Sequence, residues 1–344
     1  MSTVAAIILF IAIIGYSIFG GADFGAGFWD LTAGGTDRGE QPRAVIDHSI
    51  GPVWEANHVW LIFVLVVLWT CFPDAFASIT LTMFVPLSLA ALGILIRGSS
   101  FAFRHALLNT RDRRAFGALF GVSSLLVPYC LGAIVGGVVS GRVPDGGVAG
   151  DPVDSWVNPT SIVAGVLAVC AVAFLAATYL VWDARRLSHD AMVEYFRRRA
   201  VGAGIAAGVV ALGGLAVLAN DAEYVFDGLL SRGLVFVVLS AVCGLATLWL
   251  LTRAQHRGAR LTAIGAVVSA ILAWGVAQWD YLLPETLTVE AGAAPSGTIW
   301  AVTVATVLAV LLVFPAFGLL YHLDQKGLLP DEGMPETSPT AAEV

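Results

Sequence analysis

Long apolar runs separated by polar loops constrain the fold of this chain more than any other feature. Each run is about 20 residues long, the length that an α-helix needs to cross the hydrocarbon core of a bilayer. Only 12% of the residues are charged, about half the usual share in soluble domains. The sequence therefore predicts an all-α, polytopic membrane protein. Nine transmembrane helices are expected, at 4–32, 51–72, 75–97, 115–139, 160–182, 200–219, 232–252, 259–278 and 298–322.

The basic residues predict the orientation of the chain. Of the 18 Lys and Arg residues, all except Arg142 and Arg232 fall in or beside the loops of one side, or in the C-terminal tail. By the positive-inside rule that side is cytoplasmic, so the N-terminus lies outside and the C-terminus inside. Residues 1–325 then form a single transmembrane domain. The tail, 326–344, is rich in Pro, Glu, Ser and Thr and is predicted to be disordered.

A repeated Trp-Asp pair suggests an internal duplication. Trp29-Asp30 ends the first predicted helix and Trp182-Asp183 ends the fifth, and both helices run in the same direction. The possible repeats are 1–140 and 158–278, with the ninth helix, 298–322, left over.

Polar side chains interrupt the first two predicted spans, where hydrocarbon makes them costly, and by default they mark a functional site. Asp23 belongs to a glycine-rich stretch of the first helix, and Glu55, Asn57 and His58 open the second. At 1.5 Å per residue, Asp23 lies about 28 Å along its helix, near the cytoplasmic edge of the core. Glu55 and His58 are spaced i, i+3, so that their side chains can interact.

Two compatible interpretations of these polar residues are open. A carboxylate beside an imidazole can exchange protons with it, which suits a path for proton uptake from the cytoplasm. The same groups can instead form a satisfied hydrogen-bond network that holds the first helix to the second.

Composition excludes several classes of function. Nucleic-acid binding is not expected, because no basic groove or aromatic RNA-binding motif is present. The four cysteines are far apart in apolar runs, so neither a metal site nor a disulfide framework is predicted. Three classes remain: a proton-conducting subunit of a respiratory complex, a proton-coupled secondary transporter, and a haem-binding cytochrome.

The small number of possible haem ligands argues against haem binding, and the scarcity of polar residues in the later helices argues against transport. His58 and Met83 are the His and Met that lie well inside predicted spans, fewer ligands than a many-helix haem protein needs. A transporter built from inverted repeats should carry a second polar half-site, but the sixth to ninth predicted helices contain almost no polar residues. The transporter is kept as the alternative function.

At these residues the sequence closely resembles subunit II of the cytochrome bd-type quinol oxidases. The resemblance extends from the first predicted helix to the ninth, and its first two motifs are long and specific. The matching stretches are Gly21-Ala22-Asp23-Phe24-Gly25-Ala26-Gly27, Gly51-Pro52-Val53-Trp54-Glu55-Ala56-Asn57-His58-Val59-Trp60-Leu61, Leu95-Ile96-Arg97-Gly98, Phe101-Ala102-Phe103-Arg104, and Trp274-Gly275-Val276-Ala277-Gln278-Trp279-Asp280-Tyr281-Leu282-Leu283-Pro284.

The resemblance implies a haem-free subunit that forms a heterodimer with a haem-bearing subunit I, with or without a small single-helix subunit. Subunit I would carry the haems, of types b and d, and together the subunits would oxidise quinol and reduce O2 to water in the bacterial plasma membrane. The reaction would be electrogenic without pumping. The resemblance also implies two four-helix bundles plus one extra helix.

The resemblance further implies a cytoplasmic proton path that includes Asp23 and Glu55, with His58 and Asn57 beside them. Trp54 is interpreted as a packing or interfacial aromatic, and Arg97 and Arg104 as anchors of the third helix at the inner interface. Relatives carry an acid where this chain has Ala102, a departure that affects the entrance of the path.

Overall fold

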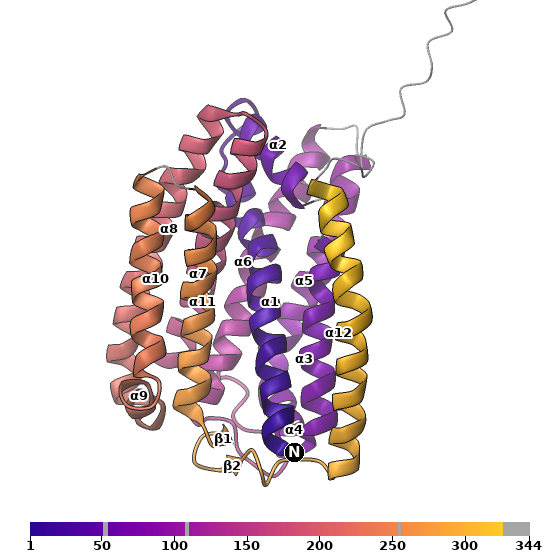
Figure 1. Ribbon diagram of the computed structural model, residues 1–344, viewed down its shortest axis with the longest axis vertical. Helices are drawn as coiled ribbons and strands as arrows, with labels where there is room; N and C mark the ends of the chain where they lie inside the picture. Colours follow the sequence, from indigo (N-terminus) through magenta and orange to yellow (C-terminus); the bar gives the residue numbers. More distant parts are fainter. Residues whose placement is uncertain (51–53, 107–109, 254–255, 326–344) are drawn as a thin grey trace, which may run out of the picture.

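The chain folds into a bundle of long helices capped at one end by a short β-hairpin (Figure 1). The computed structural model describes residues 1–50, 54–106, 110–253 and 256–325. The predicted tail, 326–344, lies outside the described residues. The elements are α1 Ser2–Leu31, α2 Thr36–Ile50, α3 Trp54–Cys71, α4 Pro73–Thr82, α5 Phe84–Ala106, α6 Thr110–Val139, α7 Pro159–Arg186, α8 Asp190–Asp221, α9 Glu223–Leu230, α10 Leu234–Thr252, α11 His256–Gln278, β1 Tyr281–Leu283, β2 Leu287–Thr288 and α12 Ser296–Gln325.

Most of these helices are long and apolar enough to cross a membrane. In the described part of the chain, eight helices meet that criterion, and a shorter apolar helix spans Asn57–Cys71 within α3. They run side by side along the long axis of the bundle (Figure 1). The prediction of an all-α polytopic membrane protein is confirmed, whereas the count of nine spans stays a prediction.

The third predicted span was misplaced. A continuous helix was expected at 75–97, but α4 ends at Thr82, and after Met83 a new helix, α5, begins at Phe84. The apolar span is Phe84–Phe103. Pro86 explains the break, because proline lacks an N–H and is tolerated in the first turn of a helix but not in its interior. The helix therefore restarts near Pro86.

The polar helix α2 and the hairpin lie at opposite ends of the bundle (Figure 1). The α2 end carries α2, a polar helix that sequence analysis did not predict, and the ion pair between Arg43 Nε and Asp30 Oδ1 at 2.8 Å joins α2 to α1. The opposite end, called the hairpin end, carries the N-terminus, α4, α9, β1 and β2. Strands β1 and β2 pair antiparallel.

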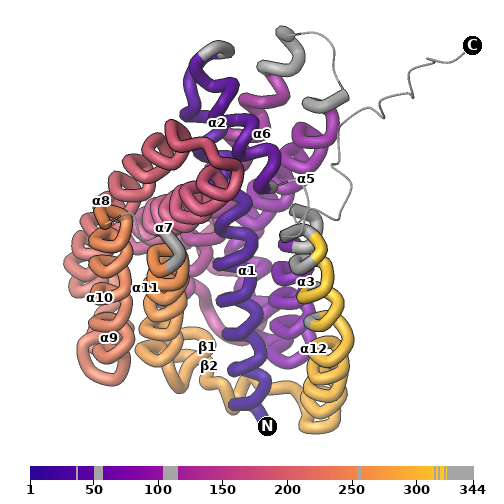
Figure 2. Tube along the Cα trace, turned by 45° about the horizontal axis from the view of Figure 1, so that its top comes forward, coloured from indigo at the N-terminus to yellow at the C-terminus, as the bar shows by residue number. Residues whose placement is uncertain are grey.

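Helix α1 lies at the centre of the bundle, between α3 and α7 (Figure 2). It approaches α7 closely at Gly25, where a Cβ atom would overlap the backbone of Val172. One turn further, Trp29 Nε1 donates a hydrogen bond to the Ala173 carbonyl at 2.8 Å. Small residues at such crossings let helix backbones meet in lipid. The position of α1 is thereby fixed against α7.

The remaining helices pack mainly with their neighbours in sequence. Helix α5 packs on α6, α7 on α8 and α10 on α11, whereas α1 and α6 both contact α7. Helix α12 lies at the edge of the bundle, in contact with α3 and α1 (Figure 2). The duplication of 1–140 and 158–278, with α12 left over, stays a prediction.

Candidate functional site

A buried ion pair between α1 and α5 lies at the centre of the candidate site. Arg97 Nη2 contacts Asp23 Oδ1 at 2.5 Å, and the two side chains are 1% and 2% exposed. Arg97 Nε donates to Ser124 Oγ of α6 at 3.3 Å. Charges are expensive to bury unless they are paired and hydrogen bonded. Asp23 and Arg97 therefore neutralise each other inside the bundle.

The buried position of Arg97 corrects its interpretation as an interfacial anchor. Had the third helix ended near residue 97, the guanidinium would have reached the membrane surface. Because α5 begins at Phe84 and continues to Ala106, Arg97 instead lies well inside the helix. The side chain faces Asp23, which is 74 positions away in the sequence.

Two aromatic rings pack close to the Arg97 guanidinium. Its Cζ atom lies 5.0 Å from the ring centroid of Phe24 and 4.9 Å from that of Phe120. A guanidinium stacked on aromatic faces gains cation–π attraction, which is strongest where water is excluded. The two rings thus hold the cation beside Asp23 and shield it from water.

His58 approaches the same site from α3. Its ring packs edge-on to Phe24, with centroids 5.8 Å apart. The Nδ1 atom of His58 is buried and has no hydrogen-bond partner among the described residues. The neighbouring Asn57 is also buried, at 8% exposure. The structure thus brings His58 near the Asp23–Arg97 pair, with Phe24 in contact with both.

The other predicted site residues are described only in part. The side chains of Trp54, Glu55 and Arg104 lie outside the part of the chain that the structure describes. Ala102 is exposed on α5. The roles of these residues stay predictions.

Sequence reasoning missed two polar residues of this site, Tyr16 and Ser124. The ring of Tyr16 packs edge-on to Phe24 with centroids 6.5 Å apart, and Ser124 bonds to Arg97 as described above. A signal for Tyr16 was present, because residues spaced i and i+7 share a helix face and Tyr16 precedes Asp23 by that spacing. Ser124 gave no local signal, since its role depends on the packing of α6 against α5.

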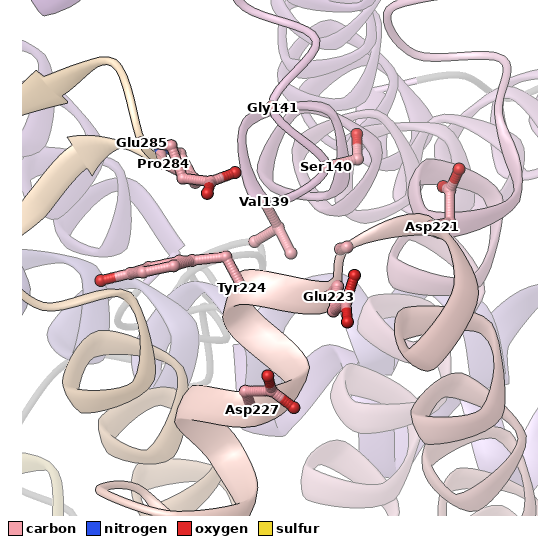
Figure 3. Close-up of a pocket in the computed structure, with 10 residues that line it drawn as sticks. Val139, Ser140, Gly141, Asp221, Glu223, Tyr224, Asp227, Pro284 and Glu285 are labelled. Atoms are coloured by element: carbon pink, nitrogen blue, oxygen red, sulfur yellow. The ribbon is translucent and has the colours of Figure 1, made fainter.

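A second group of polar residues surrounds an open pocket at the hairpin end (Figure 3). The pocket has a volume of about 340 Å³. Its lining residues are Val139, Ser140, Gly141, Asp221, Ala222, Glu223, Tyr224, Asp227, Pro284 and Glu285. Arg142 Nη2 contacts Asp221 Oδ1 at 2.6 Å, and Thr160 Oγ1 donates to Asp221 Oδ2 at 2.6 Å. The pocket is acidic, and both carboxylate oxygens of Asp221 accept hydrogen bonds from Arg142 and Thr160.

The buried cluster of Asp23, Arg97 and His58 is therefore a stronger candidate for the functional site than the pocket. It places an aspartate, an arginine and a histidine in an apolar interior, where ionisable groups are rare and mark ion or proton pathways. Within the described ranges, no group of three or more His, Cys, Asp and Glu residues could hold a metal ion. Of these three groups, the aspartate and the histidine are the ones whose side chains can exchange protons.

Comparison with known proteins matches almost the whole chain to one family. The family model described as "Cytochrome bd terminal oxidase subunit II" matches residues 1–324. The chain is 27% identical over 161 residues to cytochrome bd ubiquinol oxidase subunit 2 of Bacillus subtilis (strain 168), which covers 46% of this chain and 47% of that protein. This match thus spans about half the length of that relative.

Two further similarities extend over nearly all of the chain. The putative cytochrome bd menaquinol oxidase subunit II of the same organism is 21% identical over 321 residues, covering 90% of this chain and 91% of that protein. A chain in the structure of bd oxidase from Geobacillus thermodenitrificans superposes with a TM-score of 0.77 at 25% identity. The superposition covers 94% of this chain and 98% of that one.

Proposed function

This chain belongs to the cytochrome bd terminal oxidase subunit II family, and on that premise we propose that it is the haem-free subunit of a quinol oxidase. Its partner would be a haem-bearing subunit I, with haems b and d, that oxidises quinol and reduces O2 to water. A small single-helix subunit can complete the assembly. The complex would lie in the bacterial plasma membrane.

The His and Met side chains that could serve as axial haem ligands in this chain support the assignment of haem to the partner. His58 is the one histidine well inside a predicted span, and its ring packs against Phe24. The Met83 side chain is fully buried beyond α4, toward the hairpin end. Axial haem ligands must face each other across one iron, and these two residues are separated along the bundle. Within the described part of the chain, these two residues therefore do not form a haem site.

The nine-helix topology belongs to the same proposal. The α2 end would be cytoplasmic, because the loops of this end carry most of the basic residues. The N-terminus would then lie outside and the C-terminus inside. Two four-helix groups, α1, α3, α5 and α6, then α7, α8, α10 and α11, with α12 as the extra helix, would make up 1–325.

The chain itself would conduct protons from the cytoplasm toward the partner subunit. Protons would enter at the α2 end near Glu55 and reach His58 and Asp23. The observation that carries this proposal is the buried Asp23–Arg97 pair beside His58, because Asp23 Oδ2 and His58 Nδ1 keep free hydrogen-bonding capacity among the described residues. Groups in that state can accept a proton and pass it on.

The consequence is electrogenic chemistry without pumping. Quinol oxidation would release protons outside, and formation of water would consume protons taken from inside. The role of Arg97 would be to hold Asp23 in place and to offset its charge. No redox centre is needed in this chain for that role.

Purification through a tag on this chain tests the proposal. We expect a second large subunit to co-purify, with a haem signal in the reduced-minus-oxidised spectrum and quinol-driven O2 uptake. Glu55→Gln should lower the uptake roughly tenfold or more while the haem signal is kept. Glu290→Gln, an exposed carboxylate beyond β2, is the matched control and should leave the uptake unchanged.

Two outcomes would contradict the proposal. A chain that purifies alone, without haem and without oxidase activity, would overturn the assignment and favour the proton-coupled transporter. Full uptake in Glu55→Gln would overturn the proton path but leave the oxidase assignment intact.

A further inference from the structure

Three buried polar atoms around Phe24 have no hydrogen-bond partner among the described residues: Tyr16 Oη, Asp23 Oδ2 and His58 Nδ1. Buried polar atoms in native proteins are almost always hydrogen bonded, and where protein groups do not serve, ordered water does. Two more such atoms occur elsewhere in the described part of the chain, Ser155 Oγ and Tyr195 Oη. Three of the five thus gather at one site.

The tyrosine is aimed at this site by a glycine. A Cβ atom at Gly20 would lie 2.8 Å from Tyr16 Cε2, so only a residue without a side chain lets the ring lie along α1. In this position the ring meets the edge of Phe24. The ring therefore extends along α1 from Tyr16 past Gly20 toward Phe24, although Tyr16 begins about 10 Å closer to the hairpin end than Asp23.

The histidine reaches the same place from the neighbouring helix. Phe24 contacts Tyr16 on its own helix and His58 on α3. Asp23 and Arg97 interact electrostatically with Tyr16, and Arg97 interacts with His58. Tyr16 and His58 thus gather around Phe24, next to Asp23 and close to Arg97, between α1, α3 and α5.

We propose that Tyr16, Asp23 and His58 bind ordered water between α1 and α3, and that Tyr16 is the positioning residue for that water. Its O–H would donate to the water, Asp23 Oδ2 would accept, and His58 Nδ1 would take either role according to its protonation. A site for water needs two to four polar partners, which this set supplies. The water binding stands by itself, whereas its part in proton transfer rests on the proposed function.

The water would extend the proton path beyond Asp23. Asp23 alone ends the chain of polar groups that starts at the α2 end. Tyr16 adds a group deeper in the bundle, toward the middle of the membrane. Protons could then move from the carboxylate through water without rearrangement of the Asp23–Arg97 pair.

Infrared difference spectroscopy of the purified complex tests the water site directly. We expect an O–H stretching band of internal water that shifts in H2¹⁸O. Tyr16→Phe should lose or move this band. Tyr195→Phe removes a hydroxyl that is equally buried and unpartnered but lies on α8, so the band should persist. A complex with no such band, or a band unchanged in Tyr16→Phe, would overturn the proposal.

The midpoint of thermal unfolding gives a second readout. Its change in Tyr16→Phe has opposite signs for a hydroxyl that binds water and for one that has no partner. If water binds the hydroxyl, Tyr16→Phe removes a hydrogen bond and lowers the midpoint by about 2 °C. If the hydroxyl has no partner, the same change removes an unsatisfied polar group and raises the midpoint. A raised midpoint would therefore also overturn the water site.

Oxygen uptake separates this inference from the proposed function. We expect Tyr16→Phe to lower uptake roughly tenfold, with the deficit growing as pH rises and protons become scarce, and Tyr195→Phe to leave uptake unchanged. A purely packing role of Tyr16 would not give this pH profile. A persistent water band with normal uptake in Tyr16→Phe would keep the water site but contradict its part in proton transfer.

Discussion

Two Asp–Arg ion pairs in this chain have nearly the same length and opposite surroundings. Arg97 and Asp23 contact each other at 2.5 Å with side-chain exposures of 1% and 2%. Arg142 and Asp221 contact each other at 2.6 Å with exposures of 32% and 18%. The N···O distance therefore does not distinguish the two ion pairs. They differ in the burial of their side chains and in the number of hydrogen bonds that each aspartate accepts.

The pair at the hairpin end is a complete structural link. Both Asp221 carboxylate oxygens accept hydrogen bonds, from Arg142 Nη1 and Nη2 and from Thr160 Oγ1. It ties the loop after α6 to the first turn of α7 and the last turn of α8. The buried pair leaves Asp23 Oδ2 without a partner among the described residues. An incompletely bonded charge in the interior is a poor stabiliser, which is why the proposed proton path includes Asp23.

The largest effect is expected from removing the buried cation. Arg97→Met would leave the Asp23 carboxylate buried without its cation, at a cost of about 3–5 kcal/mol in the free energy of unfolding. Arg198→Met, at an exposed arginine paired with Glu194, should cost roughly 0.5 kcal/mol or less. Denaturant titration of the complex in mixed micelles measures both. Adding Asp23→Asn to Arg97→Met should recover much of the loss, and a further loss would contradict the pairing.

The next effect separates the two aspartates by activity. Asp23→Asn keeps the shape of the side chain but removes the titratable group, so quinol-driven O2 uptake per haem should fall roughly 10- to 100-fold. Asp221→Asn makes the same chemical change in the hairpin-end pair and should leave uptake per haem unchanged. Equal uptake in the two variants would show that the burial of Asp23 has no functional meaning.

The membrane fold could be predicted from the sequence because its signal is local. A run of about 20 apolar residues specifies a spanning helix without knowledge of its neighbours, and a carboxylate such as Asp23 inside a run is conspicuous. The misplacement of the span predicted at 75–97 also has a local cause. Apolar residues continue through Met83, and the start of α5 depends on how Pro86 fits a first turn, which hydropathy does not measure.

The partners in the site could not be predicted, because they depend on packing between distant segments. Arg97 meets Asp23 across 74 positions of sequence, and nothing local distinguishes an arginine at the end of a helix from one in its interior. Helix α2 was missed because it is polar and carries no membrane signal. Its position is fixed by the contact of Arg43 with Asp30.

A smaller effect is expected when the hairpin-end link is broken. Arg142→Met should cost about 1 kcal/mol in the free energy of unfolding, because Asp221 is partly exposed and keeps its bond to Thr160. Added salt should weaken the contribution of this pair, since exposed charges are screened. The same titration in mixed micelles, at low and high salt, measures it. A cost as large as that of Arg97→Met would remove the distinction between the two pairs.

The smallest effect concerns a third aspartate, which is bonded by backbone instead of arginine. The backbone N–H groups of Asp154 and Val153 donate to Asp151 Oδ1 at 2.7 and 2.8 Å and lower the pKa of its carboxyl. The stabilisation is therefore present above the unfolded pKa of about 3.9 and is lost as the pH falls through the folded value.

Asp151→Ala should accordingly lower the thermal midpoint slightly at neutral pH, and the difference from the wild-type chain should shrink once the pH falls below about 3.9. Asp145→Ala, at an exposed position in the same loop, controls for the loss of one negative charge. Scanning calorimetry across this pH range measures both. A difference that grew on acidification would mean that the carboxyl is stabilised in its protonated form, contrary to the two backbone hydrogen bonds.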